Sequence, residues 1–316
     1  MRSRILEWGR EIGLSHVGIA PADGPPPRAV FFRDWLARGF HASMDYLARD
    51  PDARSDPGRI LEGCRSVICC ALDYEDQLPD PAKGKPELAR IARYAWGDDY
   101  HDVLGEKLRA LADRIRAAWP EVRTRVAVDA SPVLEKAFAA RAGLGWIGKH
   151  GCLIHPDRGS YFFLGEIFTT LDLPADEPAA NRCGSCQRCI DACPTGAIVE
   201  PGVVDARLCL AYWTIEHRGP IDEALHAPME NWVFGCDVCQ DVCHWNKKKA
   251  ASSADPRFAP RAANLGRTLA EWSGTAIEEF RARFRGSAVK RARHDGFIRN
   301  VAIAARNAAG ARETNQ

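Results

Sequence analysis

Four closely spaced cysteines are the residues of this chain with the clearest chemistry. They occur as C-x2-C-x2-C-x3-C-P between Cys183 and Pro194. This is the run of bacterial two-cluster ferredoxins, in which three thiolates at short spacing surround one iron–sulfur cube. Zinc is the alternative, but zinc sites usually use two separated CxxC or CxxH pairs. The spacing therefore favours a [4Fe–4S] cluster over zinc.

The fourth cysteine of the run predicts a second cluster, because in this pattern it ligates the other cluster. Further cysteines follow as Cys209, a 26-residue insertion, and then C-x2-C-x3-C, with His244 where the ferredoxin run has proline. Two such clusters would carry single electrons to a site held by the rest of the chain. Exchanging the last ligands predicts cluster 1 on Cys183, Cys186, Cys189 and Cys243, and cluster 2 on Cys193, Cys209, Cys236 and Cys239.

The bulk composition is that of a cytoplasmic globular protein. With 316 residues, 46% of them hydrophobic and 27% charged, the chain is long enough for two domains. No apolar run approaches the roughly 20 residues of a membrane span, and the N-terminus predicts an amphipathic helix rather than a secretory signal. Disulfides are therefore not expected. The scattered cysteines are predicted to be buried free thiols: Cys64, Cys69, Cys70 and Cys152.

The elements that must position this chemistry precede the cysteine-rich segment. Helical patterns occur at 101–119 and 133–143. Strand character occurs at 15–20, 65–72, 124–129 and 161–169. This alternation of strands with helices predicts an α/β layer domain.

Asp129 is the most interesting single residue of that domain. It closes the strand at 124–129, and Ser131-Pro132 then offers an N-cap and a first-turn proline for the next helix. An acid at the carboxyl end of a strand in an α/β sheet lies where ligands usually bind. The alternative is a carboxylate that merely favours the helix N-terminus. Position alone does not separate the two.

A glycine-rich turn follows the second predicted helix. Gly143-Leu-Gly145-Trp-Ile-Gly148 matches GxGxxG, but it ends a helix instead of opening one, so Gly143 is predicted at the C′ position. The P-loop is excluded as well, because His150 follows Lys149 where Ser or Thr is required. We expect these glycines to let the backbone approach something flat or bulky, with a purely structural turn as the alternative.

The net charge of +1 hides a basic C-terminal part. From Trp245 onward, 15 Lys and Arg face 6 Asp and Glu, an excess of +9 that leaves −8 for residues 1–244. Such a segment either solvates a surface or binds a polyanion such as nucleic acid.

With these segments assembled, the chain resembles the epoxyqueuosine reductases, the cobalamin-dependent iron–sulfur enzymes of queuosine biosynthesis. The resemblance runs in one order from about residue 3 to residue 306. The cysteine array alone would also fit other reductases. The matching stretches outside it are GFHASMDYLARDPDARSDP at 39–57, RYAWGDDYHDVL at 93–104, VDASPVLEKAFAARAGLGWIGKHGCLI at 128–154 and GSYFFLGEI at 159–167.

The resemblance implies three parts in the chain. The first, at 1–172, would be an α/β (α+β) cobalamin-binding catalytic domain, and the second, at 173–248, a ferredoxin-like domain with two [4Fe–4S] clusters. The third, at 249–316, would be a short basic helical segment that contacts tRNA and resembles the start of the HEAT-like repeat region in longer members. The chain stops soon after, which leaves the extent of the tRNA footprint open.

The resemblance also implies base-off cobalamin between the first two domains, with cluster 2 nearer to the corrin. The sequence agrees, because Asp99-Tyr-His101-Asp-Val-Leu104 lacks the glycine of DxHxxG, the motif that supplies a histidine below cobalt. The residues expected to contact the cofactor are Asp129, Trp146, Gly148, Lys149, Leu153, Leu164, Ala211, Cys236 and Asp237.

By the same resemblance, Asp129 matches the proton donor of the family. Reduction of an epoxide to an alkene consumes two electrons and two protons, and an acid is needed because alkoxide and hydroxide are poor leaving groups. A carboxylic acid partly desolvated beside a corrin is expected to have a raised pKa and to stay protonated near neutrality.

The implied substrate is tRNA with epoxyqueuosine at the wobble position. Bases of single-stranded loops are recognised when they splay into pockets, and the phosphates bind Lys and Arg. The expected tRNA contacts are Arg218, Lys247, Lys248, Lys290, Arg291 and Arg293. We also expect a low-potential electron donor, such as flavodoxin or ferredoxin with its reductase. The protein is expected to be a monomer and not to bind a membrane.

Two other functions fit part of the pattern. A reductive dehalogenase would share cobalamin and two clusters, but those proteins normally carry a twin-arginine export signal, and their substrates do not explain a basic tail. A non-enzymatic electron carrier would explain the cysteines but would leave Asp129 and a large domain without a role.

Overall fold

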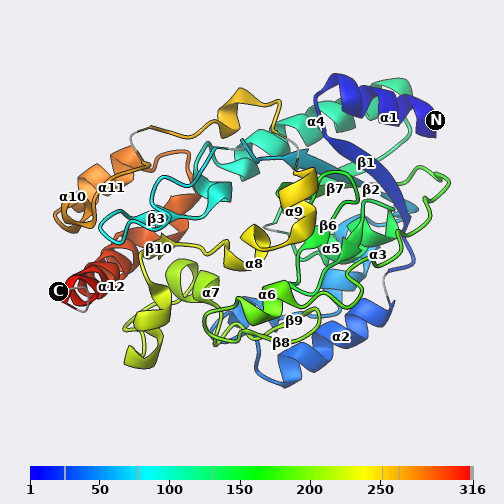
Figure 1. The fold of residues 1–316 in the computed structure, drawn as a ribbon. Coiled ribbons are helices and arrows are strands. Elements are labelled where there is room, and N and C mark those ends of the chain that lie inside the picture. The colour runs from blue at the N-terminus through cyan, green and yellow to red at the C-terminus, as the bar shows by residue number, and fades with distance from the viewer. Residues whose placement is uncertain (25, 77, 130, 251, 263, 314–316) are drawn as a thin grey trace.

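A four-stranded sheet forms the centre of the first part of the molecule (Figure 1). The computed structural model describes residues 1–24, 26–76, 78–129, 131–250, 252–262 and 264–313. All three strand pairings of the sheet are antiparallel, so this part has the α+β form of the predicted class rather than a parallel sheet. In spatial order the strands are β1 (His16–Pro21), β2 (Ser66–Asp73), β7 (Phe162–Thr169) and β4 (Thr124–Ala127).

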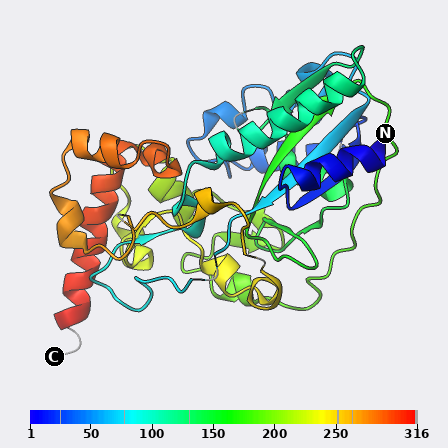
Figure 2. The ribbon, with the colours of Figure 1, turned by 90° about the horizontal axis from the view of Figure 1, so that it is seen from above.

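Helices cover both faces of this sheet. On one face, α1 (Arg2–Glu11) and α4 (Tyr100–Ala118) pack through side chains such as Leu104 and Leu108. On the other face, α5 (Glu135–Arg141) packs through Phe138. Because both faces are covered, all eight residues of β2 are buried. Figure 2 shows α1 and α4 lying over the strands.

Shorter elements connect the strands of the sheet. Between β1 and β2 the chain forms α2 (Pro26–Ala37), the 3-10 turns η1 (Asp45–Leu47) and η2 (Ala53–Ser55), and α3 (Pro57–Ile60). Between β2 and α4 lie β3 (Arg90–Ile91) and η3 (Arg93–Ala95). Before β7, β5 (Trp146–Ile147) and β6 (Leu153–Ile154) form a small hairpin.

The cysteine-rich segment folds into short helices and strands beside the sheet. The first half contains α6 (Arg188–Asp191) and the hairpin of β8 (Ile198–Glu200) and β9 (Val203–Val204). The second half contains α7 (Leu210–Ile215), η4 (Glu223–Leu225), η5 (Ala227–Met229), β10 (Trp232–Phe234), α8 (Val238–Asp241) and α9 (His244–Lys249). This arrangement brings the two cysteine runs to neighbouring helices.

The C-terminal part is packed into the molecule and is not a free basic arm. It consists of η6 (Pro256–Phe258), α10 (Leu269–Ser273), α11 (Ile277–Arg283), η7 (Ala288–Ala292) and α12 (Arg293–Glu313). Trp272, Phe284 and Phe297 share one apolar core with Trp96 and Phe234. The domain boundaries at 172/173 and 248/249 stay a prediction, and this core crosses both of them.

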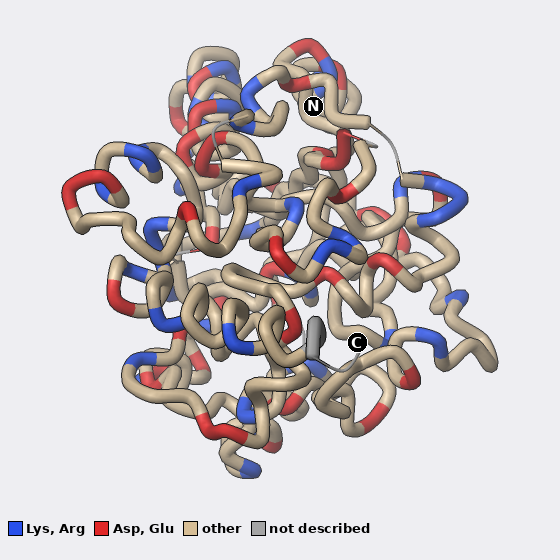
Figure 3. The backbone as a smooth tube through the Cα atoms, turned by 60° about the vertical axis from the view of Figure 1, so that its left-hand side comes forward, with Lys and Arg blue, Asp and Glu red and all other residues tan. Residues whose placement is uncertain are grey.

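Charge and hydropathy add two observations. Lys and Arg are interspersed with Asp and Glu along the whole backbone (Figure 3). Across the described segments, no helix has the length and apolar character needed to cross a membrane.

Candidate active site

The first predicted cysteine quartet comes together at the β5–β6 hairpin. Cys183 and Cys243 belong to one apolar cluster with Trp146 and Trp245. Burial, together with charge at Cys243, Cys183 and Cys186, raises the pKa of the Cys189 thiol to about 11. Since such interactions need proximity, the structure places these thiols around one point. They are the predicted ligands Cys183, Cys186, Cys189 and Cys243.

The second predicted quartet gathers beside the first. Burial raises the pKa of the Cys236 thiol, and charge at Cys209 and Cys193 adds to that effect. Burial also raises the pKa of the Cys239 thiol, and charge at Cys152, Cys236 and Cys209 adds to that effect. Cys193 therefore lies near Cys209 and Cys236 of the other run, as the crossed arrangement requires. Ligation itself remains a prediction.

The donor chemistry of both quartets suits iron–sulfur clusters. All twelve cysteines are free thiols. Within the described ranges, no three His, Cys, Asp or Glu side chains lie close enough to share a single metal ion. A cube of four irons binds each cysteine at a different iron, so its four ligands are more widely spaced than those of one ion.

Asp129 projects from the loop after β4 into accessible space. Its side chain is 59% exposed, and its backbone has φ of +51°, an uncommon value for a residue with a Cβ. The loop is held by Glu135, whose Oε1 accepts a hydrogen bond from the Asp129 backbone N–H at 2.6 Å. The prediction that Ser131-Pro132 begins the next helix is wrong, because α5 begins at Glu135 after Leu134. The local N-cap signal was overridden by the turn that positions Asp129.

His101 is the functional side chain that sequence reasoning missed. Its Nε2 atom lies 3.0 Å from Oδ2 of Asp129, and its Nδ1 atom lies 2.7 Å from Oδ1 of Asp99. Its ring stacks on Tyr100 at 4.1 Å, and Tyr100 stacks on Phe163 of β7 at 4.3 Å. Asp99 is the N-cap of α4, so the start of this helix fixes the imidazole against Asp129. The available signal was the Asp99-Tyr-His101 motif, which places a histidine two residues after an acid. In the sequence it bears only on whether a histidine binds cobalt.

The pKa values of His101 and Asp129 differ from the expectation that Asp129 stays protonated near neutrality. The hydrogen bond from His101 lowers the pKa of Asp129, and this effect exceeds that of burial, which raises it. Burial lowers the pKa of His101, but hydrogen bonds to Asp129 and Asp99 outweigh it and raise the pKa to about 9. The expectation of a raised pKa for Asp129 is therefore wrong. The proton resides on the imidazole near neutrality, and Asp129 is a carboxylate.

Two further carboxyl groups lie behind the Asp129 loop. Burial and the charge of Asp129 raise the pKa of Glu135 to about 7. Glu166 of β7 is fully buried, and burial raises its pKa well above the usual range, with a further contribution from Glu135. No described residue forms a hydrogen bond with either oxygen of Glu166. Glu166 is therefore protonated.

Tyr94 connects Asp129 with the second quartet. Burial raises the pKa of its phenol, and charges at Asp129 and Asp237 raise it further. Asp237 follows Cys236 directly and accepts a hydrogen bond from the Arg93 backbone N–H at 2.7 Å. The phenol of Tyr94 is therefore within electrostatic reach of both Asp129 and Asp237.

The residues predicted to contact cobalamin do not all lie between Asp129 and the second quartet. The indole Nε1 of Trp146 donates to Sγ of Cys183 at 3.4 Å, and Lys149 donates to the Gly184 carbonyl at 2.8 Å, so both lie against the first quartet. Leu153 is buried in a core beneath the sheet, against which the partly buried Leu164 packs. Ala211 is partly buried, and Gly148 and Asp237 are buried.

The residues predicted to contact tRNA separate into two groups. Lys290 bonds Oδ2 of Asp99 at 2.8 Å, and Arg218 donates to the Arg291 carbonyl at 2.8 Å. Burial lowers the pKa of Arg218, as does the charge of Arg293. These four therefore lie near His101 and Asp129. Lys247 and Lys248 are instead exposed on α9, the helix that begins directly after Cys243 of the first quartet.

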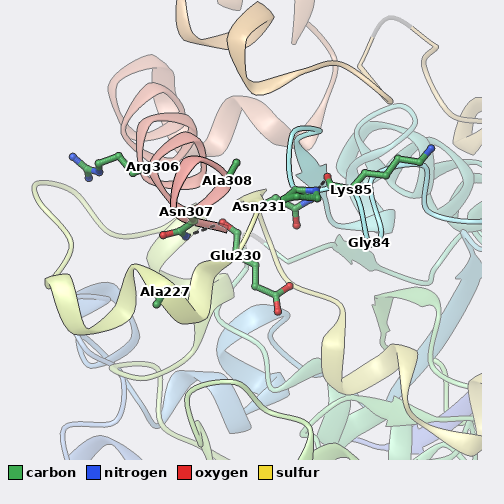
Figure 4. A pocket seen from close by; sticks show the side chains of 10 residues that line it. Gly84, Lys85, Ala227, Glu230, Asn231, Arg306, Asn307 and Ala308 are labelled. Carbon is green, nitrogen blue, oxygen red and sulfur yellow. Dashed lines mark hydrogen bonds between the residues drawn. The ribbon is translucent and has the colours of Figure 1, made fainter. Parts of the chain in front are cut away.

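A separate hollow lies between α12 and η5 (Figure 4). Asn307 reaches across it and donates to the carbonyls of His226 and Glu230. None of the residues predicted for catalysis, cofactor or tRNA is among those described as lining it. It is therefore not the candidate active site.

Comparison with known proteins agrees with this geometry. Residues 54–130 match the family model described as epoxyqueuosine reductase QueG, DUF1730, and residues 182–246 match that of the 4Fe-4S double cluster binding domain. Epoxyqueuosine reductase of Gloeobacter violaceus is 46% identical, over 98% of this chain and 96% of that protein.

Solved structures are similar over the same extent. One is of epoxyqueuosine reductase with an epoxyqueuosine-modified stem loop of tRNA-Tyr, at 29% identity and a TM-score of 0.91, covering 97% of this chain and 81% of that one. Another, from Bacillus subtilis, is described with its catalytic Asp loop swung out of the active site, at 28% identity, a TM-score of 0.91 and the same coverage.

Proposed function

The chain belongs to the epoxyqueuosine reductase family and is thus an oxidoreductase; from that premise we propose that it reduces epoxyqueuosine to queuosine at the wobble position of tRNA. The observation that carries this proposal is the accessible Asp129 carboxylate, hydrogen-bonded to a protonated His101, in a chain that also matches the double-cluster domain.

We assign cobalamin to the region between Asp129 and the second quartet. Ala211 of α7 and Leu164 of β7 are both partly buried and are our candidates to border it from the two parts of the chain. With Tyr94, Asp237 and Asp129 they are the side chains that would hold the corrin. When bound, cobalamin would supply the low-potential electrons for carbon–oxygen cleavage. Trp146 and Lys149 are assigned instead to the surroundings of cluster 1.

The base-off state without a histidine ligand is supported by the imidazole at the site. Both ring nitrogens of His101 are engaged by carboxylates, at 2.7 Å and 3.0 Å. An imidazole in this state has no free lone pair for a metal. His101 is therefore assigned to proton transfer and not to cobalt.

The two protons of the reaction are supplied by residues of this chain. Epoxide, two electrons and two protons yield alkene and water, so the oxygen must be protonated as its carbon–oxygen bonds break. Asp129 receives a proton from Nε2 of His101 and delivers it to that oxygen. The accessible Asp129 carboxylate faces the site, while Asp99 and Lys290 hold the imidazole from behind. Reprotonation of His101 then provides the second proton.

The tRNA would approach over η7 and the end of α7. There Arg218, Lys290, Arg291 and Arg293 gather beside His101 and Asp129, which suits an RNA backbone. The likeness to a structure that holds an epoxyqueuosine-modified stem loop supports this approach. A low-potential donor such as flavodoxin or ferredoxin, a monomeric state and a cytoplasmic location complete the proposal.

The test is anaerobic purification, reconstitution with iron, sulfide and cobalamin, and an assay on tRNA that carries epoxyqueuosine. We expect two four-iron clusters and one cobalt per chain, a base-off cobalamin spectrum, and queuosine in the digested tRNA. Asp129→Asn should retain iron, cobalt and tRNA binding but lose roughly 100-fold or more of the rate. Full clusters without cobalt retention or queuosine formation would leave only an electron carrier and contradict the proposal.

A further inference from the structure

Tyr46 is an accessible aromatic ring at the edge of the space that contains Asp129. It lies in η1, and the residue is 41% exposed. Burial of its phenol oxygen raises the pKa of Tyr46, and the charges of Glu216 and Asp129 raise it further. The phenol is therefore within electrostatic reach of Asp129, while a large part of the side chain stays open to solvent.

Two arginines contact Tyr46, one at its ring and one at its backbone carbonyl. The Cζ atom of Arg291 lies 6.0 Å from the ring centroid, and Glu216 holds this guanidinium at 2.8 Å and 2.7 Å. Arg54 donates from Nη2 to the Tyr46 carbonyl at 3.3 Å, and the Arg54 carbonyl accepts from the Leu134 N–H at 2.9 Å. The backbone of Arg54 is thus tied to the segment just before α5. Its guanidinium is engaged by no carboxylate among the described hydrogen bonds and ion pairs.

The loop that carries Tyr46 is anchored to the cysteine-rich part. The Ser43 hydroxyl lies 2.6 Å from the Tyr212 hydroxyl of α7, and the Ser43 N–H donates to the same oxygen at 3.2 Å. The Phe40 carbonyl accepts from the Ala206 N–H at 2.9 Å. The ring is therefore held in place without a ligand, which reduces the entropy lost on binding.

We propose that Tyr46 is the stacking platform for one unpaired base of the RNA substrate, and that Arg54 binds the phosphate of the same nucleotide. The inference rests on the proposed function and names the part of the site that receives the RNA. Proteins bind single-stranded loops by stacking splayed bases on aromatic rings, and they pair the adjoining phosphates with arginine. For this one phosphate Arg54 is favoured over Arg291, since Glu216 already holds the Arg291 guanidinium through two hydrogen bonds. Arg291 flanks the ring on which the base would stack.

The test compares Tyr46→Leu with Tyr46→Phe in the reconstituted holoenzyme. The probe is an anticodon stem loop with epoxyqueuosine at the wobble position, and Kd is measured by fluorescence anisotropy. Loss of base stacking should weaken binding roughly 5- to 150-fold in Tyr46→Leu and raise KM similarly, with kcat little changed. Tyr46→Phe keeps the aromatic face and should bind like the wild type. Arg54→Gln should reduce the salt dependence of binding by about one phosphate contact.

Three outcomes would overturn the inference. Unchanged Kd and KM in Tyr46→Leu would show that no base stacks there. Equal losses in both Tyr46 variants would assign the effect to the hydroxyl group. A fall in kcat alone would assign the ring to the chemical step. In each case, queuosine formation by the wild type would still support the proposed function, so the two failures are distinguishable. Iron content and cluster absorbance report whether each variant is folded.

Discussion

Nε2 of His101 lies 3.0 Å from Oδ2 of Asp129, although the two residues are 28 positions apart in the chain. The contact makes the pair a single proton-holding unit, with the positive charge on the imidazole and the negative charge on the accessible carboxylate. In the proposed mechanism, the histidine supplies the proton that an ionised Asp129 lacks at neutral pH.

The pH dependence of the reaction should follow from this pair. The raised pKa of His101 means that its proton is present at neutral pH and is lost as pH rises through about 9. The wild-type kcat should therefore fall above that pH. In His101→Asn, Asp129 loses the hydrogen bond that lowers its pKa and must supply the proton alone, so the fall should begin at lower pH. The rate at neutral pH should drop by roughly 100- to 10,000-fold.

A control for this experiment is His294→Asn. His294 bonds the Thr275 carbonyl in the C-terminal part and does not contact Asp129. It should leave the pH profile of kcat unchanged. If His101→Asn retained the wild-type profile, the assignment of the proton to His101 would be wrong.

The crossed quartets predict which cysteine variants resemble each other. Cys193→Ser should lose the same cluster as Cys209→Ser, although Cys193 belongs to the first run in sequence. Cys243→Ser should match Cys183→Ser for the corresponding reason. Each variant should retain about four irons per chain, because it removes a ligand from only one of the two predicted four-iron clusters. Electron paramagnetic resonance of the reduced proteins would pair them, and pairing by position in sequence would contradict the crossed arrangement.

Because Glu166 keeps its proton in the native state, it should lower the free energy of unfolding as pH rises. The unfolded chain releases this proton above its ordinary pKa of 4.5, whereas the buried native carboxyl group keeps it. The free energy of unfolding therefore falls with increasing pH, by about 1.4 kcal/mol for each unit of pKa difference. Glu166→Gln removes this dependence, so its melting temperature should exceed that of the wild type at pH 8 and approach it at pH 5. A variant less stable at both pH values would show that the ionised carboxylate is stabilised in the native state.

The ion pair between Arg90 and Asp80 should be essential to stability. Their Nε and Oδ2 atoms are 2.8 Å apart, and the two side chains are only 7% and 8% exposed. The guanidinium also lies 3.8 Å from the ring centroid of Trp232, so it joins β3 to β10. Asp80→Asn leaves a buried cation without its closest partner and should cost about 3–5 kcal/mol.

A matched control for that variant is Asp172→Asn, which breaks the exposed pair with Arg65. Exposed pairs contribute roughly 0–1 kcal/mol, so calorimetry should detect a large fall in melting temperature only for Asp80→Asn. Similar values for the two variants would argue against a structural role for the buried pair.

The elements of the first part were largely predictable from sequence. The strand patterns at 65–72 and 161–169 correspond to β2 and β7, and the helical pattern at 101–119 corresponds to α4. Such patterns record burial along a short stretch of chain, which each element largely expresses by itself. The order and direction of the strands were not predictable. They depend on contacts between distant segments, and here these make the sheet antiparallel throughout.

The sequence by itself predicted the cysteine quartets and determined the place of Asp129 after a strand, because these depend on spacing along the chain. Only the tertiary structure decided that Asp129 meets His101, and that Lys290 reaches Asp99 from 191 positions away. It also decided the charge of Asp129. A pKa is set by the groups that fold against a side chain, and for this carboxylate the hydrogen bond from His101 outweighs burial.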